Sequence, residues 1–223
     1  MNQDRRFSYF VGQRKDADTN DKSIILGLIR RNKPAEEDIV SQARILCTEF
    51  VTTRLNRASQ LNAKQQYEAS KFIPSDTLKE IEFLAGKLEK YYGQLFNDVS
   101  EQLGIPFTSE SAVRETFRNV AENLFKERKS VTWAKVIALF CLSGSFACDC
   151  SRQNRSEFVP VIIDSFTEFV KDSLLDWIKR RGGWVDVATV YRTTSDANKL
   201  WLTSVFGALV GFIYTMFWTV NMN

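Results

Sequence analysis

The sequence predicts an all-α fold: a bundle of amphipathic helices around a buried apolar helix, followed by a C-terminal helix that crosses a membrane. Apolar residues recur at helical spacing along most of the 223-residue chain. Residues 136–148 carry no charge and are apolar on all sides, so other helices must cover them, and the run is too short to span a membrane. Residues 200–220 also carry no charge, and they are long enough to cross about 30 Å of hydrocarbon.

Composition argues against several classes of function. The 30 basic and 27 acidic residues are interspersed and give a net charge of only +3, which is typical of a solvated surface and not of a nucleic-acid-binding face. The chain has no histidine, which removes the usual nucleophilic and acid–base arrangements and argues against a zinc site. Its four cysteines are too few for a disulfide framework and suit a body in the reducing cytosol. We therefore expect no enzymatic activity, no cofactor, no metal ion and no nucleic-acid partner.

The beginning of the chain predicts an arm and then a first helix. Residues 1–33 are polar and charged apart from one short apolar run, so we expect a flexible N-terminal arm, followed by a helical bundle over residues 34–192. The first helix should begin near Pro34, because proline suits the first turn and the acidic residues 36–38 suit the positive end of the helix dipole. Its buried face is predicted to carry Ile39, Ala43, Leu46 and Phe50.

Two amphipathic helices are expected next. After a polar loop at 59–71, Ser75 can cap a helix by accepting hydrogen bonds from its first N–H groups. One apolar stripe follows on that helix, made of Leu78, Ile81, Leu84 and Leu88. Glycine and proline at 104–106 break the pattern, and Ser109 or Ser111 can cap the following helix. Its predicted buried face carries Val113, Phe117, Val120 and Leu124.

The apolar core helix comes after these and is entered at residues 131–135. A polar stretch at 149–156 is expected to end it. The helix that follows shows a stripe of Val159, Ile162, Phe166, Phe169 and Val170. Basic residues at 179–181 complement the negative end of that helix, and Gly182 can supply the left-handed residue that stops it.

Residues 199–220 are predicted to form a C-terminal membrane anchor. Trp201 and Trp218 lie near its ends, where aromatic rings prefer the level of the lipid headgroups, and Phe206 and Phe212 lie between them. No basic residue follows the span, so the body of the protein should stay on the cytosolic side. The alternative is a very apolar core helix.

Three motifs make the chain resemble the Bcl-2 family of apoptosis regulators, from about residue 34 to the C-terminus. Residues 122–125 with Thr-Trp-Ala-Lys-Val at 132–136 are similar to its first homology motif, and residues 177–186, with Arg-Arg-Gly-Gly-Trp, are similar to the second. Residues 78–88 lie where the third motif falls. The forms of the first two motifs, with Ser-Gln-Ala-Arg at 41–44, are most similar to the Bok branch.

The resemblance implies a Bcl-2-like bundle around a central hydrophobic helical hairpin, with a groove that binds a partner helix. The groove residues implied are Val120, Phe125, Trp133, Lys135, Val136, Leu139, Phe140, Gly183, Trp184 and Tyr191. The third motif is the helix that family members insert into one another's grooves, and here it comprises Leu78, Ile81, Leu84, Ala85, Gly86 and Leu88. Implied partners are therefore Bcl-2 family proteins and their death-motif helices, membrane lipid, and a second copy of the chain.

Two positions depart from the family pattern. Lys135 replaces the arginine that pairs with an aspartate of the incoming helix, and it lacks the bidentate fork of a guanidinium. It is either a solvated lysine or a cation directed at a visiting carboxylate. Gly86 replaces the aspartate of the third motif, which weakens that helix as a ligand for a partner's groove.

These observations favour a Bok-like pro-apoptotic effector that permeabilises the mitochondrial outer membrane. We expect it to be anchored by its tail in that membrane or in the endoplasmic reticulum, with its body in the cytosol. One alternative is a pro-survival homologue that sequesters death-promoting helices in the same groove, which Gly86 favours. The other is a helical membrane adaptor unrelated to cell death.

Overall fold

The computed structural model describes residues 34–58, 75–97, 99–102, 107–126 and 131–192. Contacts divide the chain into the units Met1–Ala35 and Glu36–Asn223, and every helix discussed below belongs to the second. The predicted N-terminal arm, the polar loop at 59–71, the break at 104–106 and the membrane anchor at 199–220 lie outside the described residues.

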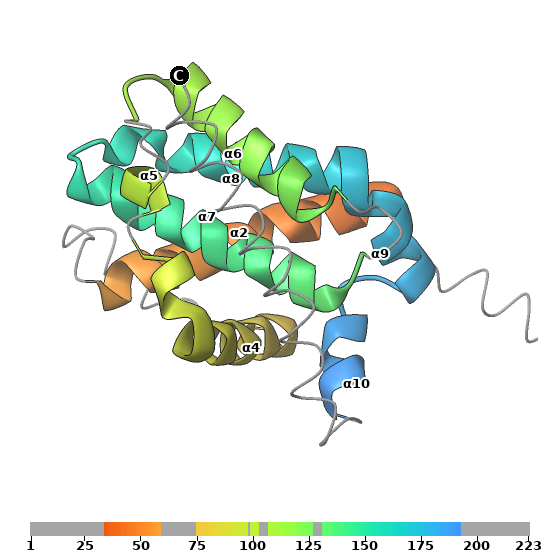
Figure 1. The fold of residues 1–223 in the computed structure, drawn as a ribbon. Helices are drawn as coiled ribbons and strands as arrows, with labels where there is room; N and C mark the ends of the chain where they lie inside the picture. The colour runs from red at the N-terminus through yellow and green to blue at the C-terminus, as the bar shows by residue number, and fades with distance from the viewer. Residues whose placement is uncertain (1–33, 59–74, 98, 103–106, 127–130, 193–223) are drawn as a thin grey trace, which may run out of the picture. The chain divides into compact units, whose positions relative to one another are not determined.

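All regular secondary structure in these residues is helical, as predicted (Figure 1). The α-helices are α2 (Glu36–Arg57), α4 (Asp76–Tyr92), α5 (Val99–Gln102), α6 (Glu110–Leu124), α7 (Trp133–Arg152), α8 (Val159–Phe169), α9 (Leu175–Arg181) and α10 (Asp186–Arg192). Short 3₁₀ turns, Gly93–Leu95 and Ser156–Phe158, follow α4 and precede α8, and a π-helical segment, Val170–Leu174, joins α8 to α9.

The apolar helix is central, as predicted. α7 contacts α2, α4, α5, α6 and α8, and Figure 1 shows it running between α4 on one side and α6 and α8 on the other. It is long and apolar enough to cross a membrane, yet 89% of its most apolar 18-residue window is buried in the structure. A helix without a polar face is stable in water only when covered in this way.

Side-chain caps set where several helices begin. The N–H of Leu78 donates to Ser75 Oγ at 3.2 Å, and the N–H of Ala112 donates to Ser109 Oγ at 3.2 Å. Both caps follow the sequence prediction, with Ser109 and not Ser111 in the capping role. α9 ends as predicted at Gly182, whose φ of 94° is left-handed and unstrained only for glycine.

The predicted stripes form the core. Ile39, Phe50, Leu78, Ile81, Val113, Phe117, Ile162 and Phe166 are all 2% exposed or less. Aromatic rings connect the helices: the centroid of Phe140 on α7 lies 5.5 Å from that of Phe50 on α2 and 4.7 Å from that of Phe166 on α8. Burial of large rings against one another gives the bundle much of its stability.

The prediction that a polar segment begins at Asp149 was wrong. α7 continues to Arg152, and Asp149 is only 2% exposed. Its Oδ2 accepts a hydrogen bond of 2.8 Å from the N–H of Ser100 in α5, and its Oδ1 pairs with Arg152. Gln153 Nε2 adds a bond of 2.9 Å to Ser100 Oγ. A buried carboxylate is tolerated here because both oxygens are satisfied, and it ties the short α5 to the core helix.

Candidate functional site

The amphipathic helix of the third motif, α4, is folded against the core. Leu78, Ile81, Leu84, Ala85 and Leu88 are each 2% exposed or less. The helix contacts α7, α2 and α10. The stripe that a partner's groove would bind is therefore covered by this protein's own helices.

The outer face of α4 presents aromatic side chains to solvent. Phe83 is 56% exposed and Tyr91 is 65% exposed. The ammonium of Lys87 lies 4.3 Å from the centroid of the Phe83 ring, a cation–π contact that lies on the surface. Gly86 is also on the exposed side, and a Cβ built there would meet nothing within 4 Å.

Two ion pairs hold α4 to α2. Arg54 pairs with Glu89, and Arg57 Nη2 lies 3.3 Å from Glu82 Oε2. The side chains of Arg54 and Glu89 are only 23% and 18% exposed, so their attraction is screened less than that of a surface pair. Burial lowers the pKa of the Arg54 guanidinium, which nevertheless keeps its charge at neutral pH.

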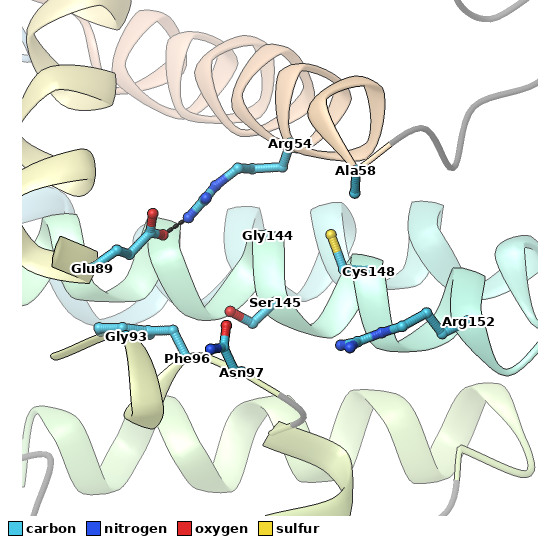
Figure 2. A pocket seen from close by; sticks show the side chains of 10 residues that line it. All are labelled: Arg54, Ala58, Glu89, Gly93, Phe96, Asn97, Gly144, Ser145, Cys148 and Arg152. Atoms are coloured by element: carbon cyan, nitrogen blue, oxygen red, sulfur yellow. Dashed lines mark ion pairs between the residues drawn. The ribbon is translucent and has the colours of Figure 1, made fainter.

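Gly144 lets Arg54 reach across the central helix. A Cβ at Gly144 would lie 3.0 Å from Arg54 Cγ and 3.2 Å from Phe50 Cε1, so α2 crosses α7 at a point where even a methyl group would require these neighbours to shift. The guanidinium of Arg54 also lies 5.4 Å from the centroid of the Phe50 ring. Figure 2 shows the arginine passing over Gly144 toward Glu89 on α4.

Opposite effects on stability are expected when these two helix glycines are replaced by alanine. Gly86→Ala should stabilise the bundle by about 0.5–1 kcal/mol, because alanine prefers a helix and the position is open. Gly144→Ala should destabilise it by about 1–3 kcal/mol, because the added carbon displaces Arg54 and Phe50. Thermal unfolding followed by circular dichroism measures both. Equal shifts of the same sign would contradict this assignment of the α2–α7 crossing.

Three tryptophans meet where α10 begins. The ring centroid of Trp133 lies 5.0 Å from that of Trp177 and 5.8 Å from that of Trp184. Trp133 Nε1 donates to Asp186 Oδ2 at 2.7 Å, and Trp184 Nε1 donates to the carbonyl oxygen of Ile39 at 2.9 Å. The second motif thus fixes the start of α10 to both α7 and α2, and Trp184 is buried at 1% exposure.

The residues predicted for the groove belong to the core where their exposure is described. Val120, Phe125, Trp133, Lys135, Val136, Leu139, Phe140 and Trp184 are each 5% exposed or less. Gly183 is buried, and Tyr191 lies on α10. Two of these residues, Phe125 and Phe140, pack against aromatic rings of other elements. The ring centroids of Phe125 and Phe169 are 5.5 Å apart. The ring of Phe140 contacts Trp184 as well as rings on α2 and α8.

Lys135 is not the solvated lysine that one interpretation of the sequence predicted. It is 4% exposed, in the first turn of α7, and its N–H donates to Thr132 Oγ1 at 3.3 Å. The positive end of the helix dipole disfavours a cation in the first turn. The Lys135 ammonium therefore depends on stabilisation by the groups that surround it.

The tertiary contacts that sequence reasoning missed join residues far apart in the chain. Arg54 with Glu89, Ser100 with Asp149 and Trp133 with Asp186 are such pairs. Taken alone, each of these residues looks in the sequence like an ordinary helix position or helix end. No local periodicity marks one as the partner of the other.

Solved structures with the same helical bundle include two of BOK. The crystal structure of chicken BOK matches with a TM-score of 0.62 at 31% identity, covering 70% of this chain and 98% of that one. The solution structure of human BOK matches with a TM-score of 0.59 at 32% identity, covering 70% and 99%. The Trichoplax adhaerens protein trBcl-2L2, in its complex with trBak BH3, shares the fold at 16% identity with a TM-score of 0.57, covering 69% and 99%. The fold is that of a Bcl-2-like bundle.

Sequence comparison places the chain more narrowly. The family described as apoptosis regulator proteins, Bcl-2 family, matches residues 81–184. Bcl-2-related ovarian killer protein homolog A of Danio rerio is 31% identical over 185 residues, which cover 77% of this chain and 81% of that protein. Human Bcl-2-related ovarian killer protein is 30% identical over 191 residues, covering 84% and 88%. The chain belongs to the Bcl-2 family and is an apoptosis regulator of the Bok type.

Proposed function

We propose that this protein is a Bok-type pro-apoptotic effector, which opens its bundle and permeabilises the mitochondrial outer membrane. The observation that carries the proposal is the nature of α7, which is long and apolar enough to cross a membrane and is buried by the helices around it. A bundle whose centre is compatible with hydrocarbon can exchange its covering helices for lipid.

Attachment to the membrane is assigned to residues 199–220, with the body in the cytosol. The 21 residues 200–220 carry no charge and 15 of them are hydrophobic, so their transfer into lipid makes insertion effectively irreversible. The anchor keeps the bundle beside the lipid that α7 would enter.

Regulation by helix-in-groove contacts forms the second part of the proposal. We place the groove along α7 between α4 and α6, because both contact α7 and α10 contacts α4 at one end. The predicted groove residues are buried, so a visiting helix reaches them only after α4 or α10 moves. Binding would then favour the opened state, and the released α4 stripe could bind a second copy.

Lys135 is assigned to the carboxylate of the visiting helix. Its place in the first turn of α7 costs electrostatic energy, which an incoming aspartate would offset. The Trichoplax protein and a zebrafish pro-survival protein bound to Bad BH3 share this fold and bind such helices, which supports a groove of this kind.

Expression of the full-length chain in cells that lack other effectors is expected to release cytochrome c from mitochondria. Gly86→Ala should slow the release, because it stabilises the closed bundle by about 0.5–1 kcal/mol. Deleting residues 199–223 should abolish it, because the soluble chain loses its attachment to lipid. Release is measured by fractionation and immunoblotting, with each variant expressed at the same level.

A pro-survival function is the second candidate. The ion pairs that hold α4 to α2 favour a bundle that stays closed. Gly86 in place of an aspartate weakens α4 as a ligand for a partner's groove. Protection of the same cells when a separate effector is supplied would establish that function and overturn the proposed one.

A further inference from the structure

A cavity lies between the C-terminal ends of α2 and α4 and the second half of α7 (Figure 2). Its volume is about 360 Å³, within the range of about 300–1,000 Å³ that is usual for sites of small molecules. None of the residues predicted for the groove lines it. Its polar lining residues are Arg54, Glu89, Asn97, Ser145, Cys148 and Arg152.

The charged groups of this cavity are two guanidiniums and one carboxylate. Arg54 enters from α2 and pairs with Glu89 of α4, whereas Arg152 enters from α7 and pairs with the buried Asp149 behind the lining. The side chains of Arg54 and Arg152 are 23% and 44% exposed, so a solute can reach both. In Figure 2 the guanidinium of Arg152 points toward Asn97 and Ser145.

Glu89 is the carboxylate that an anion would have to displace from Arg54. It lies in the last turn of α4, where the helix dipole disfavours a negative charge. Its carboxylate carries one negative charge, whereas a phosphate monoester carries up to two and three strong acceptor oxygens. Guanidinium groups bind phosphate with paired hydrogen bonds, so such an anion competes effectively with a carboxylate for Arg54.

We propose that this cavity binds a phosphate monoester group, which displaces Glu89 from Arg54. Arg152 supplies a second guanidinium, and the amide of Asn97 and the hydroxyl of Ser145 supply polar groups between the two. Occupancy removes one of the two ion pairs that hold α4 to α2. The ligand is either a soluble phosphate compound or the headgroup of a lipid, since both present the same oxygens.

Alkylation of Cys148 reports on occupancy of this cavity. Cys148 lines it and is partly exposed, whereas Cys47, Cys141 and Cys150 are fully buried. Burial also raises the pKa of the Cys47 thiol to about 12, so it carries no reactive thiolate at neutral pH. Burial raises the pKa of the Cys148 thiol as well, and the charges of Arg54 and Arg152 lower it. An anion bound between these arginines should therefore slow maleimide addition to Cys148 both by covering the thiol and by raising its pKa, and mass spectrometry assigns the modified residue.

The test uses the full-length protein in phosphatidylcholine vesicles, titrated with inorganic phosphate at constant ionic strength. Phosphate is expected to slow Cys148 alkylation with a saturable dependence. Arg54→Gln should weaken the apparent affinity about tenfold or more, since a hydrogen bond to a charged group is worth about that factor. Arg152→Gln should weaken it as well, and Glu89→Gln should strengthen it by removing the competing carboxylate.

Arg114→Gln is the matched control, because Arg114 forms an exposed pair with Glu168 at 3.0 Å and does not line the cavity. A second arm replaces free phosphate by phosphatidic acid in the vesicles. Protection by free phosphate without protection by phosphatidic acid identifies a soluble ligand. Protection by phosphatidic acid identifies a lipid headgroup, and either result supports the site. No saturable protection in either arm, or an equal loss for Arg114→Gln and Arg54→Gln, overturns it.

Discussion

Phe140→Ala is expected to lower the free energy of unfolding of the bundle by about 3–5 kcal/mol. The ring lies at the centre of the core, with its centroid 5.5 Å from that of Phe50, 4.7 Å from Phe166 and 5.9 Å from Trp184. Truncation removes buried apolar surface and leaves a cavity, because rings from α2, α8 and the turn before α10 cannot all collapse into it. Since natural domains are stable by only about 5–15 kcal/mol, this is a large share of the total.

Urea unfolding of the full-length protein in mild detergent, followed by circular dichroism, measures this loss. Phe83→Ala is the control, because its ring is 56% exposed and should change stability by less than about 0.5 kcal/mol. A similar midpoint for Phe140→Ala and the wild type would show that Phe140 does not lie in the core as described.

Asp149→Ala is expected to cost about 1.5–3 kcal/mol, although the residue looks like an ordinary polar side chain in the sequence. The carboxylate accepts the hydrogen bond from the N–H of Ser100 at 2.8 Å and is 2% exposed, so its loss leaves a buried donor without its acceptor. Arg152 is 44% exposed and can be solvated after the change, which limits the cost. Asp149→Asn should cost less, because an amide oxygen can still accept from Ser100.

Hydrogen exchange at Ser100 gives a local measurement to accompany the unfolding curve. Its amide should lose protection in Asp149→Ala and keep part of it in Asp149→Asn. Asp164→Ala is the control, because Asp164 forms a surface pair with Arg44 and should change stability by no more than about 1 kcal/mol. Equal effects of Asp149→Ala and Asp164→Ala would contradict the buried tie between α5 and α7.

Local patterns in the sequence predicted the helices and their buried faces. The stripe of α4 and its Ser75 cap depend on residues three or four positions apart, and the helical period encodes those neighbours directly. The stop at Gly182 was predictable for the same reason, since a left-handed residue favours glycine.

Contacts between distant residues could not be predicted in this way. Arg54 and Glu89 each lie on an amphipathic helix, and only the crossing of α2 over Gly144 brings them together. α7 posed a related problem, because a helix that is apolar on all sides carries no signal for which face meets which neighbour. The family resemblance assigned Phe140 and Leu139 to a groove, which stays a prediction. It did not indicate that Phe140 packs against α2, α8 and Trp184.

Release of dye from liposomes tests the central claim most directly, namely that this Bok-type protein permeabilises membranes. The full-length chain would be reconstituted into liposomes with the lipid composition of the mitochondrial outer membrane and loaded with a quenched dye. We predict release without any added activating protein, slower for Gly86→Ala and faster for Phe140→Ala, because opening of the bundle limits the rate. Intact liposomes at all protein concentrations, together with suppression of release by a second, known effector, would contradict the account and assign the protein a protective function.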